Sequence, residues 1–284
     1  MAASIALSSA IRQNLVSLQQ SETLLGSTQN RLATGKRVNT ALDSPANFFA
    51  AAGHNQRADL LTGLKDGIGE AIQTVKEADK GVSSIKDLIE GIRGQITQAR
   101  SALNDTTNSV SLLAGVATNY NSLVQQLNNT GSDSSYKGIN FLSGGSLAVN
   151  FNENATTSLT VTGFNASASG LAIASGSATG VGTSTSASFD TTAELNAAEA
   201  TLNAALATLQ TQSANLASNL TILSSRNTFL TDTVNTLREG ATKLTEADQN
   251  EEGANLLTLQ TRQQLGVTAL SISSQAAQGI LRLF

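Results

Sequence analysis

Residues 191–244 read TTAELNAAEATLNAALATLQTQSANLASNLTILSSRNTFLTDTVNTLREGATKL and carry the most regular pattern in the chain. Eight leucines follow at intervals of seven residues: Leu195, Leu202, Leu209, Leu216, Leu223, Leu230, Leu237 and Leu244. This spacing places apolar side chains along one narrow stripe of an α-helix, as in a coiled coil. Thr191 followed by Glu194 has the form of a capping box, which satisfies N–H groups at a helix start. The stretch therefore predicts one long helix that packs on a partner helix.

A second long helix is predicted in the first half of the chain. Pro45, the only proline, follows Asp43 and Ser44; either of these can cap a helix, and proline is favoured at the first helical position. Beyond it, apolar residues recur in steps of three and four from 61 to 103, and this seam includes Leu64, Ile68, Val75, Val82, Ile89 and Ile96. A third helix is predicted after a break at 104–108 and ends near residue 128. We expect the two long seams to pack together within the molecule.

The segment between the two halves has a different composition. Residues 131–190 are rich in Gly, Ser and Thr, a short strand pair is expected around Tyr136–Leu142, and alternating apolar residues at Leu147, Val149 and Phe151 predict half-buried strands. The predicted fold is mainly α: a long antiparallel helical bundle or coiled coil formed by the N- and C-terminal halves, with a small central β insert. The expected divisions are 1–42 (N-terminal core helix and linker), 43–130 (first bundle half), 131–190 (hairpin and variable domain), 191–244 (second bundle half) and 245–284 (C-terminal core helix).

The two ends of the chain carry thin apolar stripes. The predicted N-terminal helix has leucines or isoleucines seven apart, with Leu15, Glu22 and Gln29 expected on the companion row. Such narrow stripes cannot fill a core of their own, so we expect contacts between molecules. The expected contact residues are Ile5, Ile11, Leu15, Leu18, Leu25, Leu32, Leu256, Leu259, Leu270, Ile280 and Phe284.

The composition argues against several functional classes. The net charge is −4 without a basic block, which is unlike a nucleic-acid-binding protein. There are no cysteines, and the only histidine, His54, has no companion ligands at zinc-site spacing. Glu246, Asp248, Glu251 and Glu252 fit a solvated turn better than a cation site. No stretch predicts a membrane span, and the start lacks the pattern of a cleaved Sec signal peptide. No catalytic, metal or cofactor site is predicted.

Three stretches carry a resemblance to a known family. RLATGKRVNTALDSPANFFAA near the start and LREGATKLTEADQNEEGANLLTLQTRQQLGVTALSISSQAAQGILRLF at the end resemble the terminal signatures of bacterial flagellin. Tyr136–Leu142 is similar to the short hairpin of that family, with Lys137 where an asparagine is usual. The resemblance covers about 1–142 and 190–284, and the middle of flagellins is variable.

The resemblance implies a structural subunit of the helical flagellar filament outside the cell, and no enzyme activity. The terminal helices would order on assembly and form an inner core around an export channel, while the seams form a surrounding layer. Export would use the flagellar type III route with an export chaperone, and cap and hook-filament junction proteins would be further partners. The short insert implies a small outer domain.

One departure concerns recognition by animal innate receptors. Flagellins that activate them usually carry a stretch like LQRVREL, and the corresponding stretch here is Ile89-Glu90-Gly91-Ile92-Arg93-Gly94-Gln95. Gly91 replaces an arginine and Gln95 replaces a leucine, which removes donors and a packing stem. We expect weak or absent receptor activation.

Two other functions remain open on the sequence. A flagellin-like junction protein shares the end signatures, and a secreted adhesin would use the β insert for recognition. An enzyme is least expected, because the insert has no His or Cys and no clustered carboxylates. The Ser/Thr-rich stretch 156–192 fits a site for O-linked sugar and an unmodified loop equally well.

Overall fold

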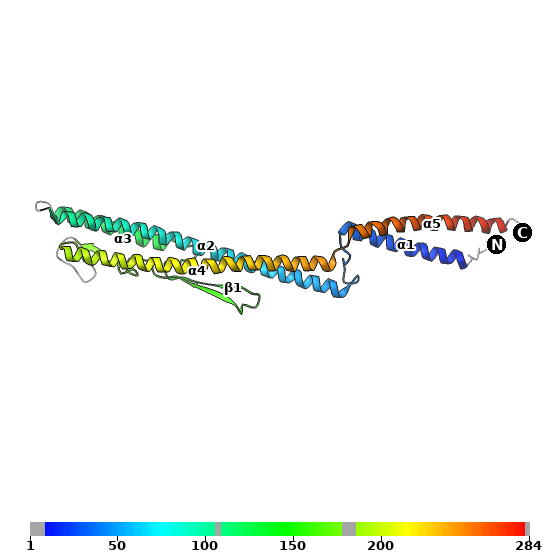
Figure 1. The fold of residues 1–284 in the computed structure, drawn as a ribbon, viewed down its shortest axis with the longest axis horizontal. Helices are drawn as coiled ribbons and strands as arrows, with labels where there is room; N and C mark the ends of the chain where they lie inside the picture. The colour runs from blue at the N-terminus through cyan, green and yellow to red at the C-terminus, as the bar shows by residue number, and fades with distance from the viewer. Residues whose placement is uncertain (1–8, 106–108, 178–185, 282–284) are drawn as a thin grey trace. The chain divides into compact units, whose positions relative to one another are not determined.

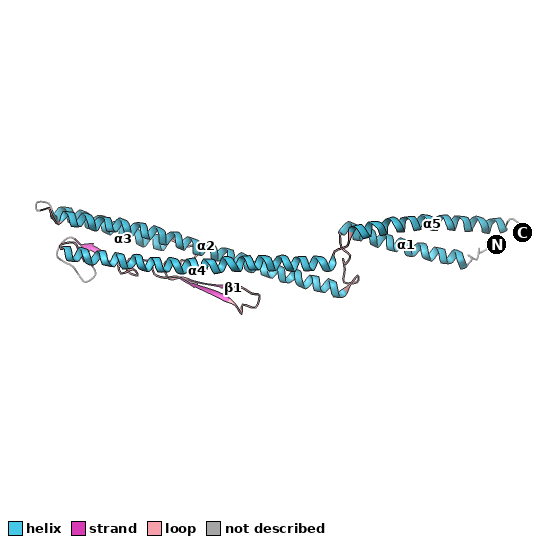
Figure 2. Cartoon of the chain, in the orientation of Figure 1, coloured by secondary structure: helices cyan, strands magenta, loops and turns pink. Residues whose placement is uncertain are grey.

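The computed structural model describes residues 9–105, 109–177 and 186–281. In this part of the chain there are five helices: α1 (Ser9–Thr34), α2 (Pro45–Ala102), α3 (Ser109–Asp133), α4 (Thr192–Thr245) and α5 (Gln249–Leu281). Four short strands follow α3 and precede α4 in the sequence. Figure 2 shows the strands in magenta and the helices in cyan, and Figure 1 shows the course of the chain. The mainly α fold with a small central β insert is confirmed. The chain divides into two compact units, Asp59–Val234 on one side and residues 1–58 with 235–284 on the other.

In the unit Asp59–Val234, α2 and α4 run antiparallel. Arg100 of α2 binds Glu199 of α4, whereas Asp79, earlier in α2, accepts a hydrogen bond from Ser213, later in α4. Most predicted seam residues are at most 3% exposed: Ile68, Val75, Val82, Ile89, Ile96, Leu202, Leu209, Leu216, Leu223 and Leu230. Leu64 is half-buried in this unit. The antiparallel packing of the two seams therefore follows the sequence prediction.

The starts of the long helices follow their local sequence signals. α2 begins at Pro45, as predicted. Thr191 Oγ1 accepts a hydrogen bond from the Glu194 backbone N–H at 3.3 Å, and Glu194 Oε2 accepts one from the Thr191 N–H at 3.0 Å, which completes the capping box. Asp43 does not cap α2 in this way. Its Oδ2 accepts hydrogen bonds from the backbone N–H groups of Asn39 and Thr40 and fixes the turn before the helix.

The central insert contains two small sheets. Strands β1 (Ser146–Asn150) and β2 (Ser158–Thr162) pair antiparallel, with Leu147 opposite Val161. Strands β3 (Ser175–Ser177) and β4 (Ser186–Ser188) pair parallel. The insert packs on α3 through Asn121, whose side chain exchanges two hydrogen bonds with the Gly176 backbone.

The expected strand pair around Tyr136–Leu142 is wrong. Only one bridge forms there, between Tyr136 and Ile139, across a tight turn in which Lys137 has φ 48° and Gly138 has φ 81°. The side chain of Asn140 explains the outcome. It donates to the carbonyls of Gly131 and Ser132 at the end of α3 and accepts from the amide of Leu142, so a side chain takes the place of a second strand.

In the unit formed by residues 1–58 and 235–284, α1 and α5 lie side by side (Figure 1). Gly35 ends α1 with φ 67°, a conformation that favours glycine and is common just past a helix end. The connections α1–α2 and α4–α5 then pair with each other. Arg37 and Val38 donate backbone hydrogen bonds to the Thr245 carbonyl, and Ala247 donates one to Gly35. These bonds lie where α1 ends and just before α5 begins.

Candidate interaction surface

The α1–α5 pair has a defined antiparallel register. Arg31 Nη1 lies 3.2 Å from Oε1 of Glu252, a side chain that is only 9% exposed. Thirteen residues earlier in α1, Leu18 packs on Gly266 of α5, and a Cβ added to that glycine would lie 2.9 Å from Leu18 Cδ2. The absence of a side chain at Gly266 therefore lets the two helices approach closely. An ion pair with a buried glutamate near one end and this close contact farther along set the register.

Within one copy, α5 covers one of the two predicted rows of α1. Ile11, Leu18, Leu25 and Leu32 are half-buried, as expected for one stripe. The companion row is not covered by α5: Leu15 is 42% exposed, and Glu22 and Gln29 are exposed too, so the predicted contact of Leu15 with other copies stays a prediction. The covered companion row consists of smaller polar side chains, namely Asn14, Ser21 and Thr28. Small side chains on this row allow the close approach of the two helices at Gly266. The longer side chains of Leu15 and Glu22 would hold the helices farther apart.

The face of α5 toward α1 contains the predicted residues. Leu259 is 9% exposed, and Leu256 and Leu270 are half-buried. Ile280 lies in α5, but its side chain is not described, and Ile5 and Phe284 lie outside the described residues. The covered positions of α5 are spaced by three and four residues and form one stripe: Leu256, Leu259, Gln263, Gly266 and Leu270.

A second apolar stripe on α5 was missed by the sequence reasoning. Leu257, Leu265 and Ile272 are 67%, 65% and 62% exposed. At 100° per residue they lie on the helix face opposite the stripe that α1 covers. Their spacing of eight and seven residues was visible in the sequence. Between Gly253 and Leu281, α5 carries a single charged side chain, Arg262, three residues before Leu265, so most of the residues that flank this stripe are uncharged.

A cavity of about 480 Å³ lies where the two connections meet in this unit. Its floor contains Val38, Ala51 and Ala241, each at most 4% exposed. Its rim is polar and includes Asn39, Asn55, Glu246 and Gln249. The backbone N–H groups of Thr40 and Asn39, which donate to Asp43 beside this rim, hold the pKa of that carboxyl below its ordinary value.

The carboxylates near the start of α5 have structural roles. Asp248 Oδ1 accepts the backbone N–H of Asn250 at 2.9 Å and so caps the helix, and Glu252 pairs with Arg31. His54 is half-buried on α2. Within the described ranges, no three His, Cys, Asp or Glu side chains gather closely enough to hold a metal ion.

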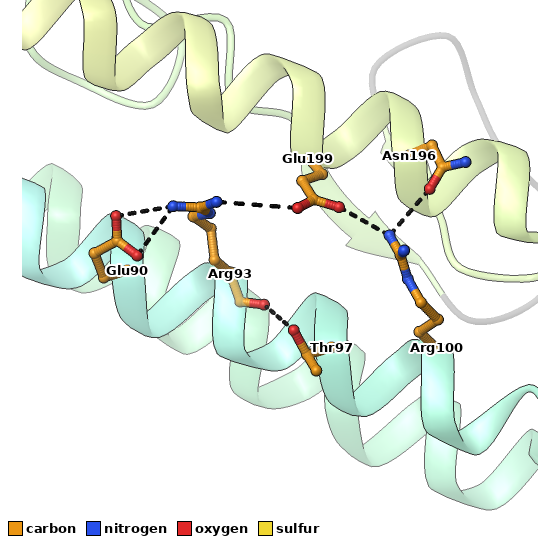
Figure 3. Close-up of polar contacts among 6 residues, drawn as sticks. All are labelled: Glu90, Arg93, Thr97, Arg100, Asn196 and Glu199. Carbon is orange, nitrogen blue, oxygen red and sulfur yellow. Dashed lines mark hydrogen bonds and ion pairs between the residues drawn. The ribbon is translucent and has the colours of Figure 1, made fainter.

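In the other unit, an ion-pair network links α2 to α4 (Figure 3). Arg93 binds Glu90 at 3.1 Å on its own helix and reaches Glu199 of α4 at 4.0 Å. Arg100 binds the other oxygen of Glu199 at 2.8 Å and the Asn196 side chain at 3.0 Å. Two arginines seven residues apart thus hold one glutamate, which fixes the helix register at this point.

The two predicted receptor positions lie beside this network on α2. Gly91 is exposed, and an added Cβ would make only an ordinary contact, 3.6 Å from Leu123 Cδ1. Gln95 is half-buried, and its buried Oε1 accepts no hydrogen bond from the described residues. Neither position therefore presents the side chain that the receptor-activating pattern has.

The tight turn after α3 is tied to α2 by one carboxylate. Glu70 Oε2 accepts a hydrogen bond from the Tyr136 hydroxyl at 2.9 Å and pairs with Lys137 Nζ at 2.9 Å. The hydrogen bonds from Lys137 and Tyr136 lower the pKa of Glu70, and the same bonds raise the pKa of each partner. These contacts offset part of the strain of a positive φ at Lys137.

Long helices with coiled-coil seams, a paired set of terminal helices and an uncovered apolar stripe define a structural protein that associates with other protein surfaces. The model of the bacterial flagellin N-terminal helical region matches residues 5–146, and that of the C-terminal helical region matches residues 199–284. The chain belongs to the bacterial flagellins, the structural subunits of the flagellar filament outside the cell. It is thus a member of a structural family, not of an enzyme family.

Full-length relatives agree with this assignment. Flagellin FljM of Caulobacter vibrioides is 28% identical over 271 residues, which cover 95% of this chain and 94% of that protein. A flagellin of Brucella melitensis is 29% identical over 99% of each chain, and Flagellin C of Rhizobium meliloti is 25% identical over 92% of each. In the described ranges, no helix has both the length and the hydropathy that a membrane span needs.

Proposed function

We propose that the α1–α5 pair is the element through which this flagellin polymerises. The supporting observation is that α5 is apolar on two opposite faces. Its stripe with Leu259 packs toward α1, while Leu257, Leu265 and Ile272 on the other face are more than 60% exposed. An exposed apolar stripe of this length is typical of a protein interface, and the partner is another copy of the chain.

In this assembly the stripe on α5 meets a different surface of the next copy, which makes the contact heterologous. Heterologous contacts that do not close produce an open helical polymer. The terminal segments, 1–42 and 245–284, order on assembly and form the inner core around an export channel. The segments 43–130 and 191–244 form the surrounding layer, and 131–190 faces outward.

The same assignment implies partners beyond other copies of this chain. The chain leaves the cell through the flagellar type III route with the help of an export chaperone. It is added beneath a cap protein, on hook-filament junction proteins. Each of these partners follows from the family and not from a contact in the described residues.

The test replaces the exposed stripe without touching the covered one. Leu257→Gln, Leu265→Gln and Ile272→Gln together are expected to abolish filament formation, as measured by pelleting and negative-stain microscopy. Gln260→Ala, an exposed position on the same helix, is the control and leaves assembly unchanged. Helical content by circular dichroism should match in all three proteins. Normal filaments from the triple variant would contradict the proposal.

A deletion experiment separates this function from its rivals. The full-length chain is compared with a version that lacks residues 1–40 and 245–284. If only the full-length chain forms filaments, the chain is a filament subunit. If both proteins remain soluble and folded, the junction protein or the adhesin becomes the better hypothesis.

The weak activation of animal innate receptors is also proposed here. Gly91 offers no side chain, and Arg93 is already engaged by Glu90 and Glu199. The space beside Gly91 accepts a Cβ, so Gly91→Arg with Gln95→Leu is expected to fold normally. In receptor-reporter cells this double variant should give a stronger response than the natural protein. A potent response from the natural protein would contradict the proposal.

A further inference from the structure

Leu42 is the most exposed large apolar side chain among the described residues, at 96%. It occupies the turn Thr40–Asp43, which is closed by a hydrogen bond of 3.1 Å from the Asp43 N–H to the Thr40 carbonyl. The central positions of such turns favour Gly, Asn, Asp or Ser. Turn formation therefore gives no reason for a leucine at this place.

The turn holds Leu42 in a fixed position. Asp43 Oδ2 accepts three hydrogen bonds, from the Asn39 N–H at 3.0 Å, the Thr40 N–H at 2.8 Å and the Thr40 hydroxyl at 3.2 Å. The backbone that carries Leu42 is therefore already ordered, and only the freedom of its side chain is lost when a partner covers it. Leu42 is thus a preorganised apolar projection.

The cavity at the connections, in the same compact unit, combines an apolar floor with a polar rim that includes Lys36 and Glu246. Its volume of about 480 Å³ is in the range that accepts small organic groups, about 300–1,000 Å³. Val38, Ala51 and Ala241 give it a buried apolar floor, and Ala52 on its wall is exposed. The cavity therefore has room for one leucine side chain with part of its turn.

We propose that Leu42 of one copy inserts into the cavity between the α1–α2 and α4–α5 connections of a second copy. The second copy is the occupant because the chain belongs to a family of self-assembling subunits, and in a polymer other copies surround this unit. Projection and cavity are different surfaces of one unit, so the contact is heterologous and repeats along an open polymer. The inference rests on the proposed function and adds a second contact beside the α5 stripe.

Cross-linking tests the contact directly, because the chain has no cysteine. Copies that carry only Leu42→Cys are mixed with copies that carry only Ala52→Cys, assembled and oxidised. A disulfide needs Cα atoms about 4.4–6.8 Å apart. Insertion of position 42 into the cavity brings it close to position 52 of the second copy, so cross-linked dimers are expected on a denaturing gel. In the control mixture, copies with Leu60→Cys take the place of the Ala52→Cys copies. Leu60 is an exposed leucine of the other unit. Filaments whose dimer yield does not exceed this control would overturn the inference.

Assembly thermodynamics gives an independent measurement. Leu42→Asn and Ala52→Phe, which fills the cavity, are each expected to raise the critical concentration for polymerisation by about tenfold. Because both remove one contact, the double variant should differ little from either single variant. An unchanged critical concentration for Leu42→Asn would refute the inference while the α5 proposal stands. If the natural protein itself fails to polymerise on preformed filament seeds, both the inference and the proposed function are refuted.

Discussion

The contact between Gly266 and Leu18 predicts that one substitution has opposite effects in two backgrounds. In the natural protein, the added Cβ of Gly266→Ala would lie 2.9 Å from Leu18 Cδ2 and 3.0 Å from Leu18 Cγ. Cγ is near the base of the side chain, so a rotation of the end groups alone does not relieve the clash. Overpacking of this kind costs about 1–3 kcal/mol. Replacing glycine in a helix by alanine returns about 1 kcal/mol. The net expectation is a loss of about 1 kcal/mol.

In a Leu18→Ala background the atoms that clash are absent. Gly266→Ala should then stabilise the α1–α5 pair by about 1 kcal/mol, from helix propensity alone. Gly253→Ala is the matched control, because this glycine is also in α5 and nothing lies within 4 Å of an added Cβ. It should stabilise the pair by a similar amount in both backgrounds.

The critical concentration for assembly measures these changes, since about 1.4 kcal/mol corresponds to a tenfold difference. Gly266→Ala should raise it about fivefold with Leu18 present and lower it about fivefold with Ala at position 18. Hydrogen exchange of α1 and α5 peptides in the filaments gives the same comparison locally. Equal effects of Gly266→Ala in both backgrounds would refute the packing argument.

Four further predictions follow from local contacts. Thr191→Ala removes the cap of α4 and should lower the free energy of unfolding by about 1 kcal/mol in urea denaturation, whereas Thr191→Ser should not. Ala155→Gly should stabilise the β1–β2 hairpin by up to about 1 kcal/mol, because Ala155 has φ 52°; thermal melting without an increase would contradict this. Burial raises the pKa of Tyr120 to about 12 from an ordinary value of 10.0, so its contribution to stability is complete below about pH 10 and is lost as the pH rises toward 12. Ultraviolet titration of the phenolates, before and after unfolding in urea, checks this shift. Glu199→Gln should lower stability by less than about 1 kcal/mol, and the effect should shrink in high salt, because Glu199 and both arginines are at least a third exposed.

Much of the fold could be predicted because the helical signals are local and repeated. Each of three local signals predicted part of a helix without knowledge of the rest of the chain: the leucines seven apart in 191–244, the capping box at Thr191 and the proline at 45. The alternation at Leu147, Val149 and Phe151 did the same for β1, since a period of two belongs to a strand. By contrast, the turn at Tyr136–Ile139 depends on Asn140 reaching the end of α3, and no local pattern predicts such a contact.

The sequence by itself determined which residues share a helix stripe, because the α-helix has one period and side-chain polarity repeats with it. It also determined the family resemblance, through the motifs at both ends. Only the tertiary structure decided which of two neighbouring rows of α1 is covered, Leu15 and Glu22 or Asn14 and Ser21. The physical reason is that the partner helix sets the direction of approach, and Gly266 permits a close approach on the row of small side chains. The same structure left Leu257, Leu265 and Ile272 uncovered on the opposite face of α5.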